Sequence, residues 1–332
     1  MIKYFKIFFI NIIILIIIIF ITEIAISIFK PNHLILDNEL GWKLRPNYKK
    51  DKTEKDLYGQ TYNVKFEVDR RGIINVGDDK NKSLSILVLA DSFSSDPYVS
   101  TEKMWYGILQ NELKKKFKKN ITINVIGAGG YGSLQEYLLM KKLNLKNDLV
   151  ILQFCSNDFD NNILEIEKIN GSINQYTRRP YFTTKNEIYY DQSFLSKLLR
   201  TDFLGESRIL NKILFWYGNN KNQKEVNNEL KDRSYYITKI ILKKIRSLHP
   251  DKKFFIFNCE YSDNRWEKLA KETNFIPIIE NSVNLKEAKK NNLKIYYRDG
   301  GHYNELGHEI MGLSIAKNKQ LLDAIRLTIN KQ

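Results

Sequence analysis

The chain has 332 residues, of which 43% are hydrophobic and 27% are charged. This composition supports a buried core and excludes a disordered, collagen-like or disulfide-scaffold chain. Lys and Arg number 53 against 38 Asp and Glu, which gives a net charge of +15. The basic residues are scattered over polar helix faces, without a zinc finger, helix-turn-helix or RNA-binding motif. We therefore expect no nucleic-acid partner, with attraction to anionic lipid or a polyanionic surface polymer as the alternative.

The chain opens on an apolar segment from Tyr4 to Phe29, long enough to cross a bilayer as one helix. No Ala-x-Ala cleavage site follows, although Ala25 to Ser27 is a weak candidate. We therefore predict an uncleaved membrane anchor over residues 1–30. A cleaved signal peptide and a buried core helix are the alternatives.

The orientation of this anchor follows from the charges beside it. Lys3 and Lys6 precede the uninterrupted apolar run of this segment, residues 12–21, and favour a cytoplasmic N-terminus, although Lys30 and Lys43 follow it. We predict that the rest of the chain lies outside the cytoplasm, in the periplasm or at the cell surface.

Residues 31–82 form a turn-rich lead-in that we expect to pack on the main domain. Within it, the alternation over Tyr62–Val68 predicts a half-buried strand. From residue 83 onward, apolar runs predict five strands at 84–89, 121–126, 149–154, 253–257 and 293–297.

Helical spacing lies between these runs, over 105–117, 134–143 and 236–248, and from residue 310 onward. Alternating strands and helices predict an α/β fold, a flavodoxin-like three-layer α/β/α domain with a five-stranded parallel sheet over 83–332. Residues 160–231 are too long for an ordinary connection. We interpret them as an insertion with some helix of its own, lying over the strand ends and rich in aromatic side chains (Tyr176, Tyr181, Phe182, Tyr189, Tyr190, Trp216, Tyr217).

Polar residues and glycines follow the predicted strands, at the edge where open α/β sheets bind ligands. Ser92 follows the first run, the glycine tract 127–132 the second, Asn157 the third, and Asp299 with His302 the fifth. They provide a nucleophile, oxyanion donors, a base and a residue to orient that base. Each part alone fits an ordinary cap or turn. The glycine tract lacks the order of a dinucleotide or P-loop motif.

These blocks together resemble the SGNH, or GDSL-type, hydrolase family. ADSF is similar to its Gly-Asp-Ser block, NVIGAGGYGSLQEYLL to its glycine block, CSND to Gly-x-Asn-Asp, and DGGH to Asp-x-x-His. NELGWKLRPN and VSTEKMWYGILQNEL resemble membrane-anchored or exported members associated with bacterial surface polysaccharides. The resemblance covers about residues 38–160 and 232–325 and excludes the insertion.

The resemblance implies a role for each matching residue. Ser92 would be the nucleophile, His302 the general base and Asp299 its orienting partner. The oxyanion hole would consist of the Ser92 N–H, the Gly130 N–H and the Asn157 amide, with Gly129 as the alternative register. No cofactor or metal is implied.

Two positions depart from the family pattern, because Ala90 and Cys155 stand where glycine is usual. Neither supplies a catalytic atom in the family scheme, so the departures concern turn geometry. We expect Asp91 and Asp158 to make turn hydrogen bonds beside the site.

The remaining histidines and the two cysteines receive structural interpretations. His33, His249 and His308 are not assigned a role in the site. Cys155 and Cys259 are expected to be buried free thiols, with a disulfide as the alternative, because adjacent parallel strands rarely present the right geometry.

The resemblance implies a serine esterase that cleaves an acyl ester, O-acetyl being the expected group, on carbohydrate or a cell-surface polymer. One alternative is an O-acetyltransferase for a surface polysaccharide, which would use the same site with a membrane acyl-donor protein as partner. Another is an inactive relative that binds glycan. The presence of Ser92, Asp299 and His302 argues against the inactive relative.

Overall fold

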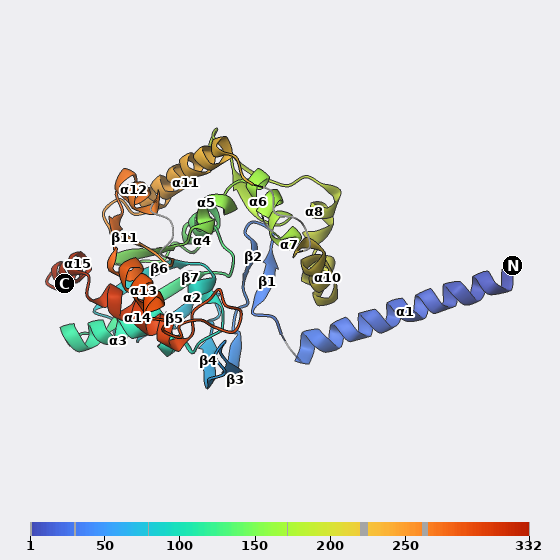
Figure 1. Cartoon of the computed structure of the whole chain (residues 1–332), viewed down its shortest axis with the longest axis horizontal. Helices are drawn as coiled ribbons and strands as arrows, with labels where there is room; N and C mark the ends of the chain where they lie inside the picture. The colour runs from blue at the N-terminus through green and yellow to red at the C-terminus, as the bar shows by residue number, and fades with distance from the viewer. Residues whose placement is uncertain are drawn as a thin grey trace.

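A computed structural model describes residues 2–29, 31–78, 80–170, 172–219, 225–260 and 265–331 (Figure 1). Lys30 and the side chains of Lys3 and Tyr217 lie outside the described part. The N-terminal helix α1 (Ile2–Phe29) projects away from the rest of the chain. Its stretch Tyr4–Phe29 has a mean hydropathy of 3.1 and is 0% buried, so it is long and apolar enough to be a membrane anchor or a signal sequence.

The centre of the molecule is a six-stranded, mostly parallel sheet. Its order is β12 (Ile276–Pro277), β11 (Lys253–Asn258), β8 (Leu149–Phe154), β6 (Leu84–Ala90), β7 (Ile121–Gly127) and β5 (Ile74–Val76). All neighbours are parallel except β5, which runs antiparallel to β7. β6, β7 and β8 are buried along their whole length, which explains their unbroken apolar sequences. The predicted α/β fold class is confirmed.

The predicted fifth strand is wrong. Residues 293–297 make only one isolated bridge, between Tyr296 and Tyr303, and the parallel edge of the sheet is β12. The run is apolar because Ile295 and Tyr297 are buried, but its backbone bonds to the segment that follows. Tyr297 N donates to His302 O at 2.7 Å, and Asn304 N donates to Ile295 O at 3.0 Å. This run therefore holds the loop of Asp299 and His302.

Helices cover both faces of the sheet. On one side α3 (Trp105–Phe117) packs on α14 (Glu305–Ala316), and on the other α4 (Ser133–Leu143) packs on α11 (Asn228–Leu248) (Figure 1). These four helices fall where helical spacing predicts them. The main domain also contains α12 (Arg265–Glu272), α13 (Glu280–Lys290) and α15 (Lys319–Ile329).

The lead-in forms two hairpins. β1 (Leu34–Asp37) pairs with β2 (Gly41–Leu44), and β3 (Lys49–Lys55) pairs with β4 (Thr61–Glu67). β4 confirms the half-buried strand predicted at 62–68, because Val64 and Phe66 are fully buried between exposed neighbours.

The insertion has secondary structure of its own. It contains α6 (Leu164–Asn170), α7 (Ile173–Tyr176), β9 (Pro180–Phe182), β10 (Ile188–Tyr190), α8 (Phe194–Leu199), α9 (Asp202–Glu206) and α10 (Arg208–Asn219). It packs against the first hairpin, where Tyr190 OH donates to Glu39 O at 2.9 Å and Arg200 donates to Asn38 O at 2.8 Å. Gly171 and residues 220–224 of the predicted insertion lie outside the described residues.

Candidate active site

Ser92 lies at the turn between β6 and the short helix α2 (Ser92–Ser95). Asp91 is the N-cap of α2, and its carboxylate accepts from Phe93 N at 3.0 Å. Since Ser92 is the first helical residue, its own N–H is not used by the hydrogen bonds within α2. The turn thus presents both the hydroxyl and the N–H of Ser92 at the end of the strand.

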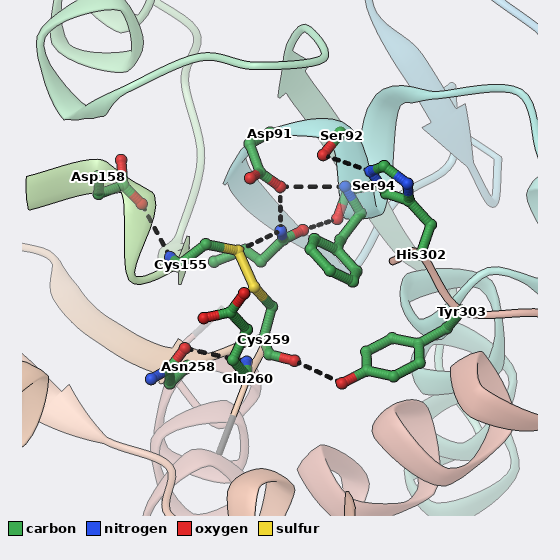
Figure 2. Close-up of a disulfide and its surroundings, with 12 residues drawn as sticks. Asp91, Ser92, Ser94, Cys155, Asp158, Asn258, Cys259, Glu260, His302 and Tyr303 are labelled. Carbon is green, nitrogen blue, oxygen red and sulfur yellow. Dashed lines mark hydrogen bonds between the residues drawn. A yellow bond between two sulfur atoms is a disulfide. The ribbon is translucent and has the colours of Figure 1, made fainter. Parts of the chain in front are cut away.

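His302 and Asp299 lie beside this serine. His302 Nε2 is 2.9 Å from Ser92 Oγ, and His302 Nδ1 is 2.6 Å from Asp299 Oδ2 (Figure 2 shows the Ser92–His302 pair). The other Asp299 oxygen accepts from the backbone N–H of Gly301 and of His302, each at 3.0 Å. Partial burial would raise the pKa of Asp299, but the hydrogen bonds from His302 and its charge outweigh burial and lower that pKa. Asp299 is therefore an ionised partner for the imidazole.

Aromatic rings surround the imidazole of His302. The ring centroids of Phe93 and Tyr98 lie 5.0 and 4.9 Å from that of His302. Tyr98 in turn stacks on Tyr297 at 4.5 Å, and Tyr297 OH donates to Glu54 at 3.1 Å. These contacts restrict the His302 ring to an orientation that faces Ser92.

A buried hydrogen-bond chain lies behind the serine turn. Trp105 Nε1 donates to Ser94 Oγ at 2.6 Å, Ser94 donates to Gln153, and the Gln153 amide donates to Asp91. All four side chains are buried, so this series of hydrogen bonds fixes the conformation of the turn that carries Ser92. Sequence reasoning missed Gln153, because a glutamine inside an apolar strand carries no recognisable motif.

The expectation of free thiols is wrong, because Cys155 and Cys259 form a disulfide (Figure 2). Cys155 follows β8 and Cys259 follows β11, and the register of these parallel strands pairs Phe154 with Asn258. The next residues are therefore opposite each other, with Cα atoms 5.4 Å apart, within the usual disulfide range. One further backbone bond, from Cys259 N to Phe154 O at 2.8 Å, extends the pairing and holds the two cysteines side by side.

The two acidic residues expected to stabilise turns do so. Asp91 caps α2, and Asp158 accepts from Cys155 N at 2.8 Å and from Ser133 Oγ at 3.1 Å. Both carboxyls are buried.

The predicted oxyanion donors lie at the ends of the neighbouring strands. Gly130 has a φ of +75° in a turn closed by Tyr131 N and Ala128 O at 3.0 Å. A Cβ would lie 2.4 Å from the Asp96 carboxylate at Gly129 and 2.8 Å from the Gln175 amide at Gly130, so these side chains would have to shift, and at Gly130 the positive φ also disfavours a side chain. Gly129 and Gly130 are both candidates for the second N–H donor of the oxyanion hole.

Asn157 is the exposed first residue of α5 (Asn157–Asn161), which follows β8. In the Asn161 orientation that pairs donors with acceptors, the Asn161 oxygen accepts from Asn157 Nδ2 at 2.9 Å. The Asn157 amide is thus held on its own helix by one of its two N–H groups, and the second N–H can donate to a ligand.

The solved structures that resemble this chain in fold include esterases and lipases. A psychrotrophic esterase from Pseudoalteromonas sp. is 11% identical, with 74% of this chain and 98% of that chain covered and a TM-score of 0.40. A lipase/acylhydrolase from Enterococcus faecalis is 11% identical, with 70% and 94% covered and a TM-score of 0.41. A carbohydrate esterase is 9% identical, with 87% and 96% covered and a TM-score of 0.37.

No protein-family model and no curated protein matches the chain. Likeness to solved structures at these identities concerns the fold alone. The fold of this chain is therefore described from its own sheet order, and the chemistry of the site is inferred from the contacts of Ser92.

Three buried carboxyl groups lie behind the site. Burial raises the pKa of Asp91 to about 7, against hydrogen bonds from Phe93 and Gln153 and the charge of His302, which lower it. Burial and the charge of Asp91 raise the pKa of Asp158, and burial with the charges of Asp158 and Asp91 raises that of Glu136. Within the described part of the chain, neither carboxyl oxygen of Glu136 has a hydrogen-bond partner. Burial without a partner therefore favours the protonated form of Glu136.

His33 lies close to the site, contrary to its sequence interpretation. Its Nε2 is 3.2 Å from Asp96 Oδ1, and Asp96 N in turn donates to Ser92 O at 3.2 Å. The two residues are 63 positions apart, so no local pattern could reveal the pair. Among the described residues no group of His, Cys, Asp and Glu is placed to hold a metal ion.

A cavity of about 640 Å³ extends from Gly129 to the end of α1. It is lined by the first hairpin, by the insertion and by Glu23 and Ser27 of α1. Trp42 lies in its wall and donates from Nε1 to Gly129 O at 2.9 Å. The cavity thus connects the glycine segment with the base of the N-terminal helix.

His308 keeps its structural interpretation. It lies inside α14 with 2% of its surface exposed, and burial together with the charge of His302 lowers its pKa to about 3. The ring is therefore neutral, packed edge-on against Tyr303.

Proposed function

We propose that the chain is an SGNH-type serine esterase in which Ser92 is the nucleophile, His302 the general base and Asp299 its orienting partner. The observation that carries this proposal is the continuous chain from Ser92 Oγ through both nitrogens of His302 to Asp299, with distances of 2.9 and 2.6 Å. A nucleophile, a base and an orienter in this order are the arrangement that activates a serine hydroxyl.

The first step forms an acyl-enzyme. Ser92 Oγ attacks the acyl carbonyl while His302 Nε2 takes the hydroxyl proton and Asp299 stabilises the imidazolium. The carbonyl electrons move to oxygen, and the N–H of Ser92, the N–H of Gly130 and the second N–H of the Asn157 amide donate to that oxyanion. When the electrons return, the ester C–O bond breaks and His302 protonates the leaving alcohol.

The second step releases the acyl group. A water molecule gives its proton to His302 and attacks the acyl-enzyme, and His302 then returns the proton to Ser92. A sugar hydroxyl in place of that water would make the same site an O-acetyltransferase, with a membrane acyl-donor protein as partner.

We propose an O-acetyl ester on carbohydrate or a cell-surface polymer as substrate, met outside the cytoplasm. Two features support this location. The chain begins with a helix able to cross a membrane, and the Cys155–Cys259 disulfide is of a kind that persists in oxidising compartments. Glu23 of this helix also accepts from Arg208 N of α10 at 2.6 Å, which favours a retained anchor over a cleaved signal peptide.

The test is acetyl-ester turnover by the full chain in detergent. The wild type should hydrolyse p-nitrophenyl acetate and an O-acetylated oligosaccharide, and Ser92→Ala and His302→Ala should not. His249→Ala, at the far end of α11, is the matched control and should keep full activity. Activity that survives Ser92→Ala would overturn the proposal. Mass spectrometry with an added unacetylated oligosaccharide distinguishes transfer from hydrolysis.

A further inference from the structure

Helix α10 of the insertion carries apolar residues on a face that is exposed within the described part of the chain. Ile209, Ile213 and Trp216 recur at helical spacing and share this face. Ile213 is 56% exposed and Trp216 is 71% exposed. Arg208 and Asn211 lie on a different face of α10 and line the cavity that ends at Gly129. The helix is therefore amphipathic, with its polar side toward the cavity.

 The N-terminus of α10 is hydrogen-bonded to the C-terminal part of α1 through Glu23. The Glu23 carboxylate accepts from Arg208 N at 2.6 Å, from Ile209 N at 3.1 Å and from Ser207 Oγ at 3.0 Å. A carboxylate at this position satisfies free N–H groups and complements the helix dipole. Since Glu23 lies six residues before the end of α1 at Phe29, α10 meets α1 roughly 9 Å before that end.

The direction of α10 also fits a bilayer surface. Figure 1 shows α10 beside the C-terminal end of α1 and crossing the direction of that helix. If α1 runs along the membrane normal, α10 runs across that normal, at the level where α1 leaves the hydrocarbon.

We propose that α10 is an interfacial helix that lies on the bilayer with Ile213 and Trp216 among the lipid headgroups and upper acyl chains. Trp is favoured at this depth, and amphipathic helices bury their apolar face there. Lys212, exposed next to Ile213, can reach the phosphate layer with its ammonium group. The bilayer is the occupant because α10 is hydrogen-bonded to α1, whose apolar side chains are largely exposed.

This docking has a consequence for the cavity beside Gly129. Because Arg208 and Asn211 of α10 and Glu23 of α1 line it, the cavity lies at the membrane-facing side of the domain. The inference concerns only α1 and α10, so it holds or fails independently of the esterase activity.

The test uses the fluorescence of the full chain in lipid nanodiscs made with ordinary or acyl-chain-brominated phosphatidylcholine. Of the four tryptophans, Trp42, Trp105 and Trp266 are at most 7% exposed, so the difference between the wild type and Trp216→Phe isolates Trp216. We expect this difference signal to be blue-shifted and to lose most of its intensity in brominated discs.

The matched control is Tyr236→Trp in the Trp216→Phe background, because Tyr236 is 48% exposed on α11, away from α1 (Figure 1). Its added signal should be the same in both kinds of disc. A Trp216 signal that bromine does not quench would overturn the proposal. Emission like that in water would then mean a solvent-exposed Trp216, and blue-shifted emission would mean that protein or a second copy of the chain covers it. Equal quenching at positions 216 and 236 would also overturn it.

Discussion

Cys155 and Cys259 are joined one residue beyond the ends of β8 and β11, with their Cα atoms 5.4 Å apart. Each cysteine is linked to a different part of the candidate site. Asn157 follows Cys155 by two residues, and Cys259 O accepts from Tyr303 OH, next to His302, at 3.0 Å. The disulfide thus connects the segment of a proposed oxyanion donor with the segment of the proposed base.

Reduction of this disulfide should destabilise the folded chain. The two cysteines are 104 residues apart, and closing a loop of this size lowers the entropy of the unfolded state. We expect a loss of about 2–5 kcal/mol in the free energy of unfolding, measured by denaturation with and without dithiothreitol. The Cys155→Ala/Cys259→Ala variant should start at the lower stability and be insensitive to dithiothreitol. Equal stability of the oxidised and reduced wild type would contradict this prediction.

Replacing Asp299 should reduce turnover while leaving the fold intact. Asp299→Asn removes the charge that stabilises the imidazolium and favours the wrong tautomer of His302. We expect kcat to fall by up to roughly 10⁴-fold with little change in KM. Because the Asp299 side chain is 38% exposed, the melting temperature should remain close to that of the wild type. A kcat near the wild-type value would remove Asp299 from the mechanism.

Asn157→Ala should remove one oxyanion donor. We expect kcat to fall roughly 100- to 1000-fold, as for the loss of a single donor in other acyl-transfer sites. Asn161→Ala is the matched control, because it frees the Asn157 amide and removes the hydrogen bond to Glu167. That control should lower the melting temperature and retain turnover. If both variants lost turnover equally, the effect would come from the packing of α5 rather than from donation.

The buried carboxyls should make stability depend on pH. Asp91 has an ordinary pKa of 3.8 that the fold raises to about 7, and the pKa of Glu136 is raised as well. Between the unfolded and folded pKa values of Asp91, the folded chain binds more protons than the unfolded chain. The free energy of unfolding therefore falls as pH rises from about 4 to about 7. Below pH 4 this stabilising contribution is complete.

Glu136→Gln tests this dependence, because glutamine is neutral and similar in shape to the protonated acid. The variant should melt at a higher temperature than the wild type at pH 8, and its melting temperature should vary less between pH 5 and 8. Glu225→Gln, at an exposed position, is the control and should change neither value. An unchanged pH profile in Glu136→Gln would show that this carboxyl does not titrate with folding.

The α/β layers and the local sequence blocks that carry the candidate site residues could be predicted from the sequence. β6, β7, β8 and β11 are short apolar runs because both faces of the sheet are covered, and such runs are visible without coordinates. Ser92, Asn157 and His302 each belong to a local block, so their approximate positions follow from the chain order. Their mutual distances do not, because they depend on how three separate loops turn.

Other features depend on contacts between distant residues. β12 has only two residues, one of them Pro277, and it forms because Phe255 and Ile256 offer an edge. The disulfide depends on a strand register across 104 residues, and the His33–Asp96 pair on packing of the lead-in against α2. No composition or periodicity encodes such pairings.

Covalent labelling of the serine tests the central claim most directly. The full chain in detergent is treated with a fluorophosphonate, digested and analysed by mass spectrometry, while acetyl-ester hydrolysis is followed in parallel. We predict that the label attaches to Ser92, that hydrolysis is lost in proportion to labelling, and that His302→Ala is labelled far more slowly. Full hydrolysis with Ser92 completely labelled, or inactivation with the label on another residue, would contradict the account.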